Sequence, residues 1–257
     1  MRNIFLLFLL FILSSCAAKK LLVENADTLL THQVTKRLPL YSKQKDNLNK
    51  DVDQFLNKAK PVAQEVLPVI DEIDLNSPDK VEKQYNKLEE YYIGLTQDFT
   101  AMLSKYMALL DKKQQKDFFE TLDDENRELL KTEKEKRLDK IEDRFKLFFG
   151  SMKNSQKQLL RDYSDYFHLR AKERLERRVK LHGELRAIFG EELSQEARSR
   201  SIEEAFSRYQ KDALKGNKNL EMLKKLLPTI SSSQKEHFRN RVKEVKEMLN
   251  HFIISEY

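Results

Sequence analysis

The feature that most constrains the fold of this chain is a stripe of apolar residues between Ser77 and Leu110, spaced alternately four and three residues apart. The stripe consists of Val81, Tyr85, Leu88, Tyr92, Leu95, Phe99, Met102, Tyr106 and Leu109. Such spacing keeps one face of an α-helix against a partner helix along its whole length. Ser77 suits the cap before a helix, and Pro78 suits the first helical position. We therefore expect a long central helix near residues 78–110, with Phe99 buried in the middle of its stripe.

Apolar residues at spacings of three and four recur from Leu22 to Ile254, and no stretch alternates with the period of two that strands show. Charged residues make up 35% of the chain, and it contains only five Gly and five Pro. That composition is typical of long helices with a solvated face. The sequence predicts an all-α fold, an elongated bundle of antiparallel helices forming a single domain over residues 21–257.

Proline and glycine mark the expected ends of several helices. Pro61 and Pro68 are expected to break the helix that follows Leu48, because proline lacks the N–H that an interior position donates. Gly150 is a suitable C-terminal cap for the helix before it. A long helix is expected from about residue 154, ending at Gly183.

A short signature occurs four times: an apolar residue, a glutamine four residues later and a second apolar residue eight residues after the first. The glutamines are Gln44, Gln114, Gln156 and Gln234. Asp111 before Gln114 and Ser231 before Gln234 have the spacing of a capping box. The signature indicates either four equivalent sites of a structural repeat or a helix-start signal used four times. Unequal distances between the copies favour the second interpretation.

The N-terminal segment has the features of a lipoprotein signal peptide. Arg2 precedes ten apolar residues, Ile4–Leu13, a run that suits a secretory signal and is shorter than the roughly 20 residues of a spanning helix. Leu13-Ser14-Ser15-Cys16 resembles the lipobox of bacterial lipoproteins. We expect residues 1–15 to be removed between Ser15 and Cys16, and residues 16–20 to form a lipidated tether. The alternative is a buried N-terminal helix with a chance cysteine.

Acylation of Cys16, the only cysteine, would leave no thiol for a disulfide or a metal site. Two or three acyl chains, palmitate among them, would hold the chain on a membrane. Ala17 follows the cysteine, where aspartate favours inner-membrane retention in enterobacteria. The expected location is therefore the periplasmic side of the outer membrane, with the inner membrane and the cell surface as alternatives.

Three stretches of the chain share motifs with a known family. Residues 25–30 read Asn-Ala-Asp-Thr-Leu-Leu and precede Leu40-x-x-x-Gln44. Residues 122–138 contain Leu-x-x-x-Asn-Arg and Lys-x-Lys-Arg-Leu, and residues 144–156 read Arg-Phe-x-x-Phe-Phe-Gly-Ser-x-x-x-x-Gln. These motifs resemble an uncharacterised family of helical lipoproteins of proteobacteria, although the chain lacks the Trp-His-Arg step expected in its second helix. The resemblance implies a lipidated, periplasm-facing helical domain of unknown function and carries over no catalytic residue.

The residues that could carry chemistry are scattered. His168 and His182 are 14 positions apart, about 21 Å along a helix, which is too far to share a metal ion, and His237 and His251 have the same spacing. No phosphate loop, His-Glu-x-x-His or Gly-x-Ser-x-Gly motif occurs. We expect no cofactor, metal site or catalytic residue, and histidines that are solvated surface residues.

Three classes of function remain. We expect a non-catalytic structural or interaction module that contacts an envelope protein or an anionic lipid. The first alternative is a carrier that binds a lipid or other apolar ligand between helices, since 15 Phe and nine Tyr suit a core or a cavity. The second is a cell-wall hydrolase, although the Glu-Ser pair and Gly-rich loop of helical muramidases are missing. Interspersed charges, 48 basic against 42 acidic, argue against nucleic-acid binding.

A row of three arginines is the candidate partner contact. Arg170, Arg174 and Arg178 are four positions apart, so they lie along one helix face and repel one another. Arg174 and Arg178 have no acidic residue three or four positions away. The row indicates an acidic residue on a neighbouring helix, plain solvent, or an external anion such as a phospholipid or lipopolysaccharide head group, or an acidic partner, held by guanidinium contacts.

Overall fold

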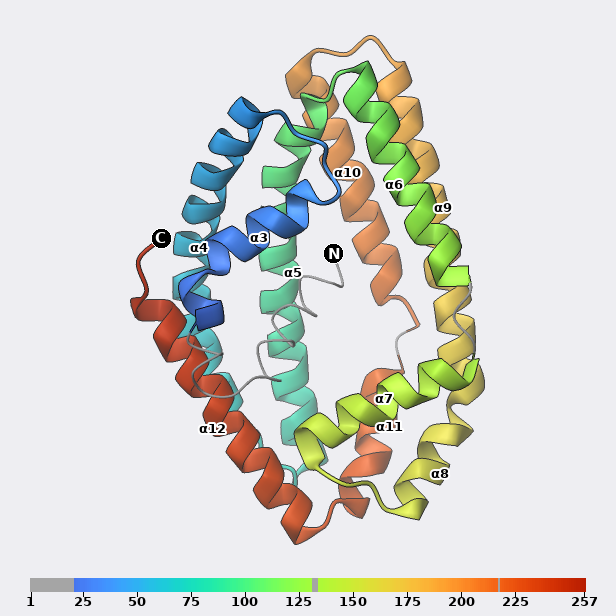
Figure 1. Ribbon diagram of the computed structural model, residues 1–257. Coiled ribbons are helices and arrows are strands. Elements are labelled where there is room, and N and C mark those ends of the chain that lie inside the picture. The colour runs from blue at the N-terminus through green and yellow to red at the C-terminus, as the bar shows by residue number, and fades with distance from the viewer. Residues whose placement is uncertain (1–20, 131–133, 217) are drawn as a thin grey trace.

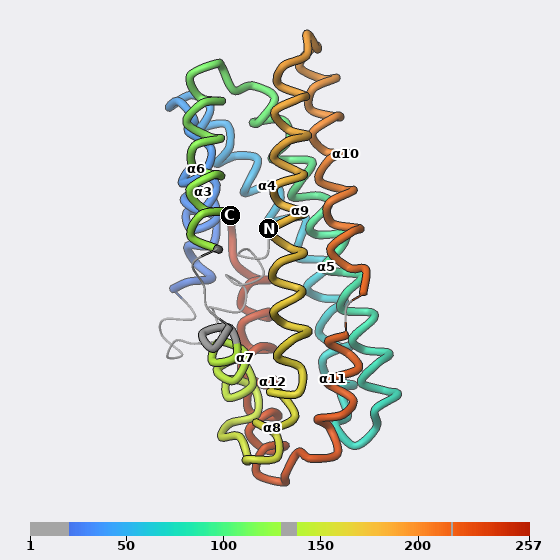
Figure 2. The backbone as a smooth tube through the Cα atoms, turned by 90° about the vertical axis from the view of Figure 1, so that its right-hand side faces the viewer, coloured from blue at the N-terminus to red at the C-terminus, as the bar shows by residue number. Residues whose placement is uncertain are grey.

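The computed structural model describes residues 21–130, 134–216 and 218–257. In these residues every regular element is helical, and most of the helices run back and forth along the long axis of an elongated molecule (Figures 1 and 2). The all-α antiparallel bundle expected from the sequence is confirmed. Ser15, Cys16 and the tether at 16–20 lie outside the described residues.

Ten α-helices and one short 3-10 helix follow the helical turn at residues 21–24 in the described chain. They are α3 (Ala26–Thr35), α4 (Ser42–Asp71), α5 (Pro78–Ala108), α6 (Lys112–Leu130), α7 (Lys134–Phe149), α8 (Asn154–Asp162), α9 (Ser164–Gly190), α10 (Gln195–Leu214), α11 (Asn219–Leu226), η2 (Leu227–Thr229) and α12 (Ser232–Ile254).

The long central helix is α5, with 31 residues. Its N-terminus forms as expected: the hydroxyl of Ser77 accepts a hydrogen bond from the Lys80 N–H, and Pro78 is the first helical residue. Phe99 is buried, as predicted, and packs against Phe55 of α4. Leu109 departs from the prediction, because the helix ends at Ala108 and leaves the Leu109 side chain 42% exposed.

Two expected helix breaks are wrong. Pro61 and Pro68 lie inside the unbroken 30-residue helix α4. Residues on both sides of Pro61, among them Leu56 and Ala63, are buried against α5 and α12. This packing on both sides of the proline outweighs the backbone hydrogen bond that it removes.

Gly183 also fails to end a helix. It lies inside α9, which continues to Gly190, and the break occurs earlier, at Tyr163 between α8 and α9. A glycine in an exposed helix interior costs only about 1 kcal/mol relative to alanine, which burial of Leu181 and Leu185 on the same helix exceeds. Gly150 does end α7, with the positive φ of 73° that glycine tolerates.

The helices follow one plan twice. Residues 26–130 form a short helix (α3), two long helices (α4 and α5) and a final helix (α6). From residue 134 onward α7 is the first helix, α8 with α9 and α10 with α11 replace the two long helices, and α12 is the last. In Figure 1 the two sets are related by roughly a half-turn about the line of sight, with α5 and α10 in contact at the centre. We call them the first and second halves.

The final helix of each half packs on the other half. The first half's α6 lies against α9, and the second half's α12 lies against α4 (Figure 1). The larger apolar core accordingly contains side chains of both halves, such as Leu48, Met107, Leu185 and Ile202. A smaller core joins α7, α8, α11 and the start of α5 at the opposite end. The chain therefore interlocks its halves instead of placing them side by side.

Candidate functional site

The four signature glutamines occupy the same place at four helix starts. Each is the third residue of its helix, and its Oε1 accepts the N–H of the residue before that helix. The donors are Tyr41 (2.8 Å), Asp111 (3.1 Å), Lys153 (2.9 Å) and Ser231 (3.0 Å). Both predicted capping boxes are confirmed, because Asp111 accepts from the Gln114 N–H at 2.8 Å and Ser231 from the Gln234 N–H at 3.3 Å.

The glutamines also contact one another in pairs, one pair at each end of the bundle. Gln114 Nε2 donates to Gln44 Oε1 at 2.7 Å, and Gln156 and Gln234 donate to each other at 3.0 and 2.9 Å. Each Nε2 also reaches a carbonyl two residues before its partner's cap. These acceptors are Leu109, Pro39, Thr229 and Ser151, for Gln44, Gln114, Gln156 and Gln234 respectively. The signature is thus a helix-start signal, and its four copies form two equivalent clasps.

A shallow hollow lies beside the second clasp. Its volume is about 410 Å³. It is lined by Phe149, Gly150, Ser151, Met152, Lys153, Ser231, Ser233, Gln234 and His237. His237 shares the carbonyl of Leu147 with Arg241, and the Ser231 hydroxyl lies 3.0 Å from that of Ser233. These side chains of the hollow are thus hydrogen-bonded within the bundle.

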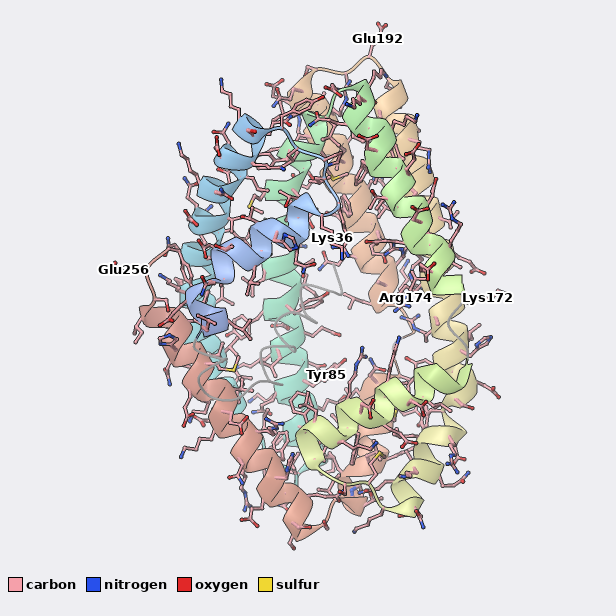
Figure 3. The ribbon with its side chains drawn as sticks, viewed as in Figure 1. Lys36, Tyr85, Lys172, Arg174, Glu192 and Glu256 are labelled. Atoms are coloured by element: carbon pink, nitrogen blue, oxygen red, sulfur yellow. The ribbon has the colours of Figure 1, made fainter. Side chains whose placement is uncertain are left out.

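Arg170, the first of the three arginines in the row, caps a neighbouring helix. Its guanidinium donates to the carbonyls of Ala213 and Lys215 at the C-terminus of α10, each at 2.8 Å, and pairs with Glu173 at 2.8 Å. Arg174 lies one turn further along α9 (Figure 3), and its side chain also takes part in an interaction.

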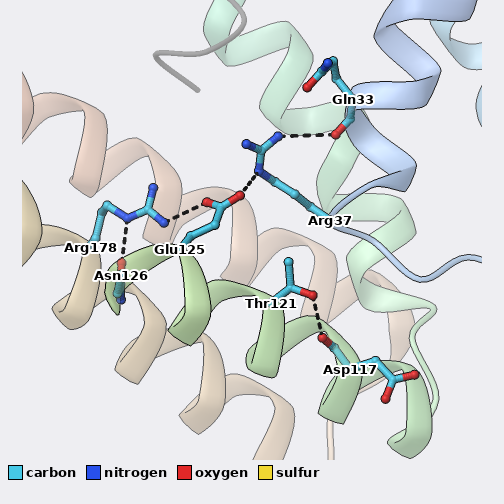
Figure 4. A network of polar contacts seen from close by, with 7 residues as sticks. All are labelled: Gln33, Arg37, Asp117, Thr121, Glu125, Asn126 and Arg178. Atoms are coloured by element: carbon cyan, nitrogen blue, oxygen red, sulfur yellow. Dashed lines mark hydrogen bonds and ion pairs between the residues drawn. The ribbon is translucent and has the colours of Figure 1, made fainter. Parts of the chain in front are cut away.

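Arg178, the third arginine, has the acidic partner on a neighbouring helix that the sequence analysis gave as one alternative. Its Nη2 lies 3.0 Å from Glu125 of α6, and its Nε donates to the Asn126 side chain at 2.9 Å. Glu125 also accepts from Arg37, which follows α3, at 2.7 Å (Figure 4). One carboxylate thus joins α3, α6 and α9, and with them the two halves of the chain.

The two guanidinium groups keep Glu125 ionised. Partial burial alone would raise the pKa of this carboxyl, but the hydrogen bond from Arg178 and the charges of Arg37 and Arg178 lower it overall. A carboxylate held between two arginines leaves this interhelical network with a net positive charge. An acidic partner on a neighbouring helix was one alternative for Arg178, but local patterns do not identify it, because Glu125 lies 53 residues from Arg178 and 88 from Arg37.

His182 corrects the expectation of solvated histidines. Its side chain is 5% exposed, and its Nδ1 lies 3.1 Å from the Asn126 Nδ2. Since the Asn126 oxygen accepts from Arg178, its amide nitrogen donates to Nδ1, which makes the imidazole neutral with its proton on Nε2. Burial first, and then the charges of Arg178 and Arg186, lower the pKa of His182 to about 4.

Stability is expected to fall below neutral pH because of this histidine. Its pKa drops from 6.5 to about 4 on folding, so the unfolded chain binds a proton that the folded chain excludes. The contribution is complete above pH 6.5 and is lost as the pH falls towards 4, about 2 kcal/mol of it between pH 7 and pH 5. In urea unfolding, the free energy of unfolding of His182→Gln should therefore fall less between pH 7 and pH 5 than that of the native chain. Equal losses in the two proteins would contradict this assignment.

The equivalent contact between α4 and α12 contains no copy of the Glu125 network. Along the chain, Val66 follows Gln44 by as many residues as Arg178 follows Gln156. Val245 follows Gln234 by as many residues as Glu125 follows Gln114. The two valines are therefore the equivalents of Arg178 and Glu125. Both valines pack against the apolar core, between α4 and α12. The same helix contact is therefore made once with apolar side chains and once with charged ones. Because apolar replacements of buried ion pairs are often neutral or stabilising, the charged contact is not by itself evidence of a more stable helix pair.

Comparison with known proteins found no matching family model, curated protein or solved structure. The likeness to helical lipoproteins therefore rests on the motifs quoted from the sequence. Among the described residues no three or more His, Cys, Asp and Glu side chains are placed to hold a metal ion. None of the helices described is both long and apolar enough to span a bilayer.

Proposed function

We propose that this chain is a bacterial lipoprotein, anchored to a membrane through acyl chains on Cys16, which acts as a non-catalytic structural or interaction module of the cell envelope. The observation that carries the proposal is Leu13-Ser14-Ser15-Cys16, a lipobox-like end to a ten-residue apolar run. The first described helical residue, Leu21, follows Cys16 by five positions. At about 3.5 Å per residue, such a tether holds the bundle within roughly 18 Å of the bilayer.

The use of polar residues supports a structural role. Hydrogen bonds to other parts of the bundle are made by the buried side chains of Gln114, Gln156, Gln234 and His182. Arg170 bonds to the C-terminus of α10, and Arg178 bonds to Glu125. These groups set helix starts and helix contacts. A periplasm-facing position on the outer membrane is the location that Ala17 favours. An envelope protein or an anionic lipid is the partner class.

Cys16→Ala is expected to abolish lipidation. Without the thiol no diacylglycerol can be attached, so the signal peptide should remain uncut and the chain should lose its acyl anchor. Growing cells with a clickable fatty acid and isolating the protein measures this directly. The matched control is Ser14→Ala, which keeps a small residue before the cysteine and should be labelled normally. Full labelling of Cys16→Ala would show that the lipobox interpretation is wrong.

A further inference from the structure

One end of the bundle carries exposed lysines around two exposed apolar side chains. We call it the basic end and define it as Tyr41, Lys43, Lys45, Leu109, Lys112 and Lys113. Tyr41 is 52% and Leu109 42% exposed, and the four lysines are exposed as well. The first clasp gathers these residues in one place, because Gln114 bonds to Gln44 at 2.7 Å and the Tyr41 hydroxyl donates to Asp111 at 2.8 Å. Glu192 lies at the same end, on the neighbouring loop between α9 and α10 (Figure 3).

These lysines lie at helix starts, where a positive charge is unfavourable. Lys43 and Lys45 lie in the first turn of α4, and Lys112 and Lys113 in the first turn of α6. A positive charge there opposes the helix dipole, and neither turn contains an acidic residue. Over the ranges that the structure describes, none of the four belongs to an ion pair. The helix dipole thus disfavours all four cations, although the Asp111 carboxylate before α6 partly balances the charge of Lys113.

The second clasp provides an internal comparison. Counting from the glutamines, Ser155, Ser232 and Ser233 take the places of Lys43, Lys112 and Lys113. Lys153 and Thr229 take the places of Tyr41 and Leu109, and the Lys153 ammonium donates to the Thr229 carbonyl at 3.2 Å. The same clasp therefore forms without exposed apolar residues and without these three lysines. The surface of the basic end is not a requirement of the helix starts beneath it.

The composition of the basic end fits a lipid head-group layer. Lysine is a mobile point charge suited to a diffuse anionic surface, whereas fixed anions are usually held by arginine. Tyrosine, with an apolar ring and a polar hydroxyl, is enriched at membrane interfaces. The starts of α4 and α6, which carry the patch, lie towards one end of the elongated bundle (Figure 2). We propose that the basic end rests on the anionic head groups of the membrane to which the chain is tethered, an inference that depends on the proposed function.

The contact requires a particular orientation of the bundle, because the basic end lies far from the expected tether. Tyr257 connects the start of the described chain with α4. Its hydroxyl donates to the Val23 carbonyl at 2.8 Å, and Lys60 of α4 lies over its ring. From Lys60 to Ser42 the helix rises about 27 Å, which is more than the roughly 18 Å that the tether spans. The bundle must therefore lean towards the membrane to bring the basic end into contact.

The test places one label at each end of the lipidated protein. Since Cys16 is the only cysteine and its thiol would be acylated, an added cysteine can be labelled alone. Ser42→Cys and Asn154→Cys stand at the first residues of α4 and α8, equivalent exposed positions at the two ends. Each labelled protein is reconstituted in vesicles of phosphatidylcholine with phosphatidylglycerol, and lipids with nitroxide head groups quench the fluorophore. Quenching is expected at Ser42→Cys and not at Asn154→Cys.

A charge variant tests the lysines. In the Ser42→Cys background, the triple change Lys43→Ser, Lys112→Ser and Lys113→Ser should weaken the contact on the order of fivefold per lysine, while the melting temperature stays equal or rises. The control removes the same charge from exposed positions elsewhere, through Lys58→Ser, Lys172→Ser and Lys243→Ser, and should keep the quenching. Pure phosphatidylcholine vesicles or added salt should abolish the contact without detaching the protein.

Several results would overturn the inference. Equal quenching at the two ends, quenching that persists in pure phosphatidylcholine, or equal losses in the two triple variants would each do so. The inference would also fail if the label at the basic end were not quenched and the triple lysine variant lost crosslinks to an envelope protein in cells. That result would assign the surface to an acidic protein. Failure of the proposed function looks different, because the unlabelled protein would then not float with vesicles of either composition and Cys16 would react with the label.

Discussion

Replacing Phe99 by alanine is expected to lower the free energy of unfolding by about 3–5 kcal/mol, the range for truncating a buried aromatic side chain. Phe99 is 2% exposed, in the larger core, with its ring centroid 5.3 Å from that of Phe55. The loss combines the transfer energy of the ring with the cavity left between α4 and α5. Guanidinium unfolding monitored by circular dichroism measures it.

Leu109→Ala serves as the control, because it removes an apolar side chain of the same sequence stripe that the structure leaves 42% exposed. Its cost should stay below about 1 kcal/mol. An unchanged midpoint for Phe99→Ala, or similar losses in the two variants, would show that the stripe does not face the core.

Replacing Gln156 by leucine is expected to cost about 3 kcal/mol, although leucine is apolar and similar in size. Gln156 is fully buried and bonds to Gln234, to the N–H of Lys153 and to the Thr229 carbonyl. Leucine satisfies none of these groups, and each buried group left without a partner costs roughly 1–3 kcal/mol. The control Gln158→Leu, on the same helix but exposed, should change stability by less than about 0.5 kcal/mol.

Gln156→Glu separates the amide's hydrogen bonds from its shape. An ionised carboxylate would face the Gln234 oxygen and the Thr229 carbonyl, so folding should raise its pKa. Stability should be lower than that of the native chain at pH 7 and should recover as the pH falls through the raised pKa towards that of an ordinary glutamate. A glutamate variant as stable as the native chain at pH 7 would contradict the clasp.

Local patterns predicted the helices and their starts, since their causes lie within a few residues. The stripe around Phe99 and the cap at Ser77 identified α5, and the glutamine signature identified four helix starts. The helix break expected at Pro61 was wrong, because packing of α4 against α5 and α12 outweighs the local tendency of proline to end a helix. The pairing of the glutamines across 70 and 78 residues could not be read from a single sequence.

The candidate site shows the same limit. Arg178 stood out because it lacks acidic neighbours on its own helix, but nothing local identifies Glu125 as its partner. His182 was taken for a surface residue, because polar spacing does not reveal that its helix face is covered by α6. The basic end was missed for another reason. Three of its lysines, Lys43, Lys112 and Lys113, become unusual only when the serines at the equivalent positions of the second clasp are known.

The exchange of final helices between the halves has a consequence for how the chain can acquire its structure. Because α4 is covered by α12, the N-terminal half cannot complete its core until the last residues are present. Contacts between such distant segments form slowly, since closing the intervening loop costs entropy before packing compensates it. For the export that we propose for this chain, the exchange of final helices is expected to delay completion of the core until the whole chain has crossed the membrane.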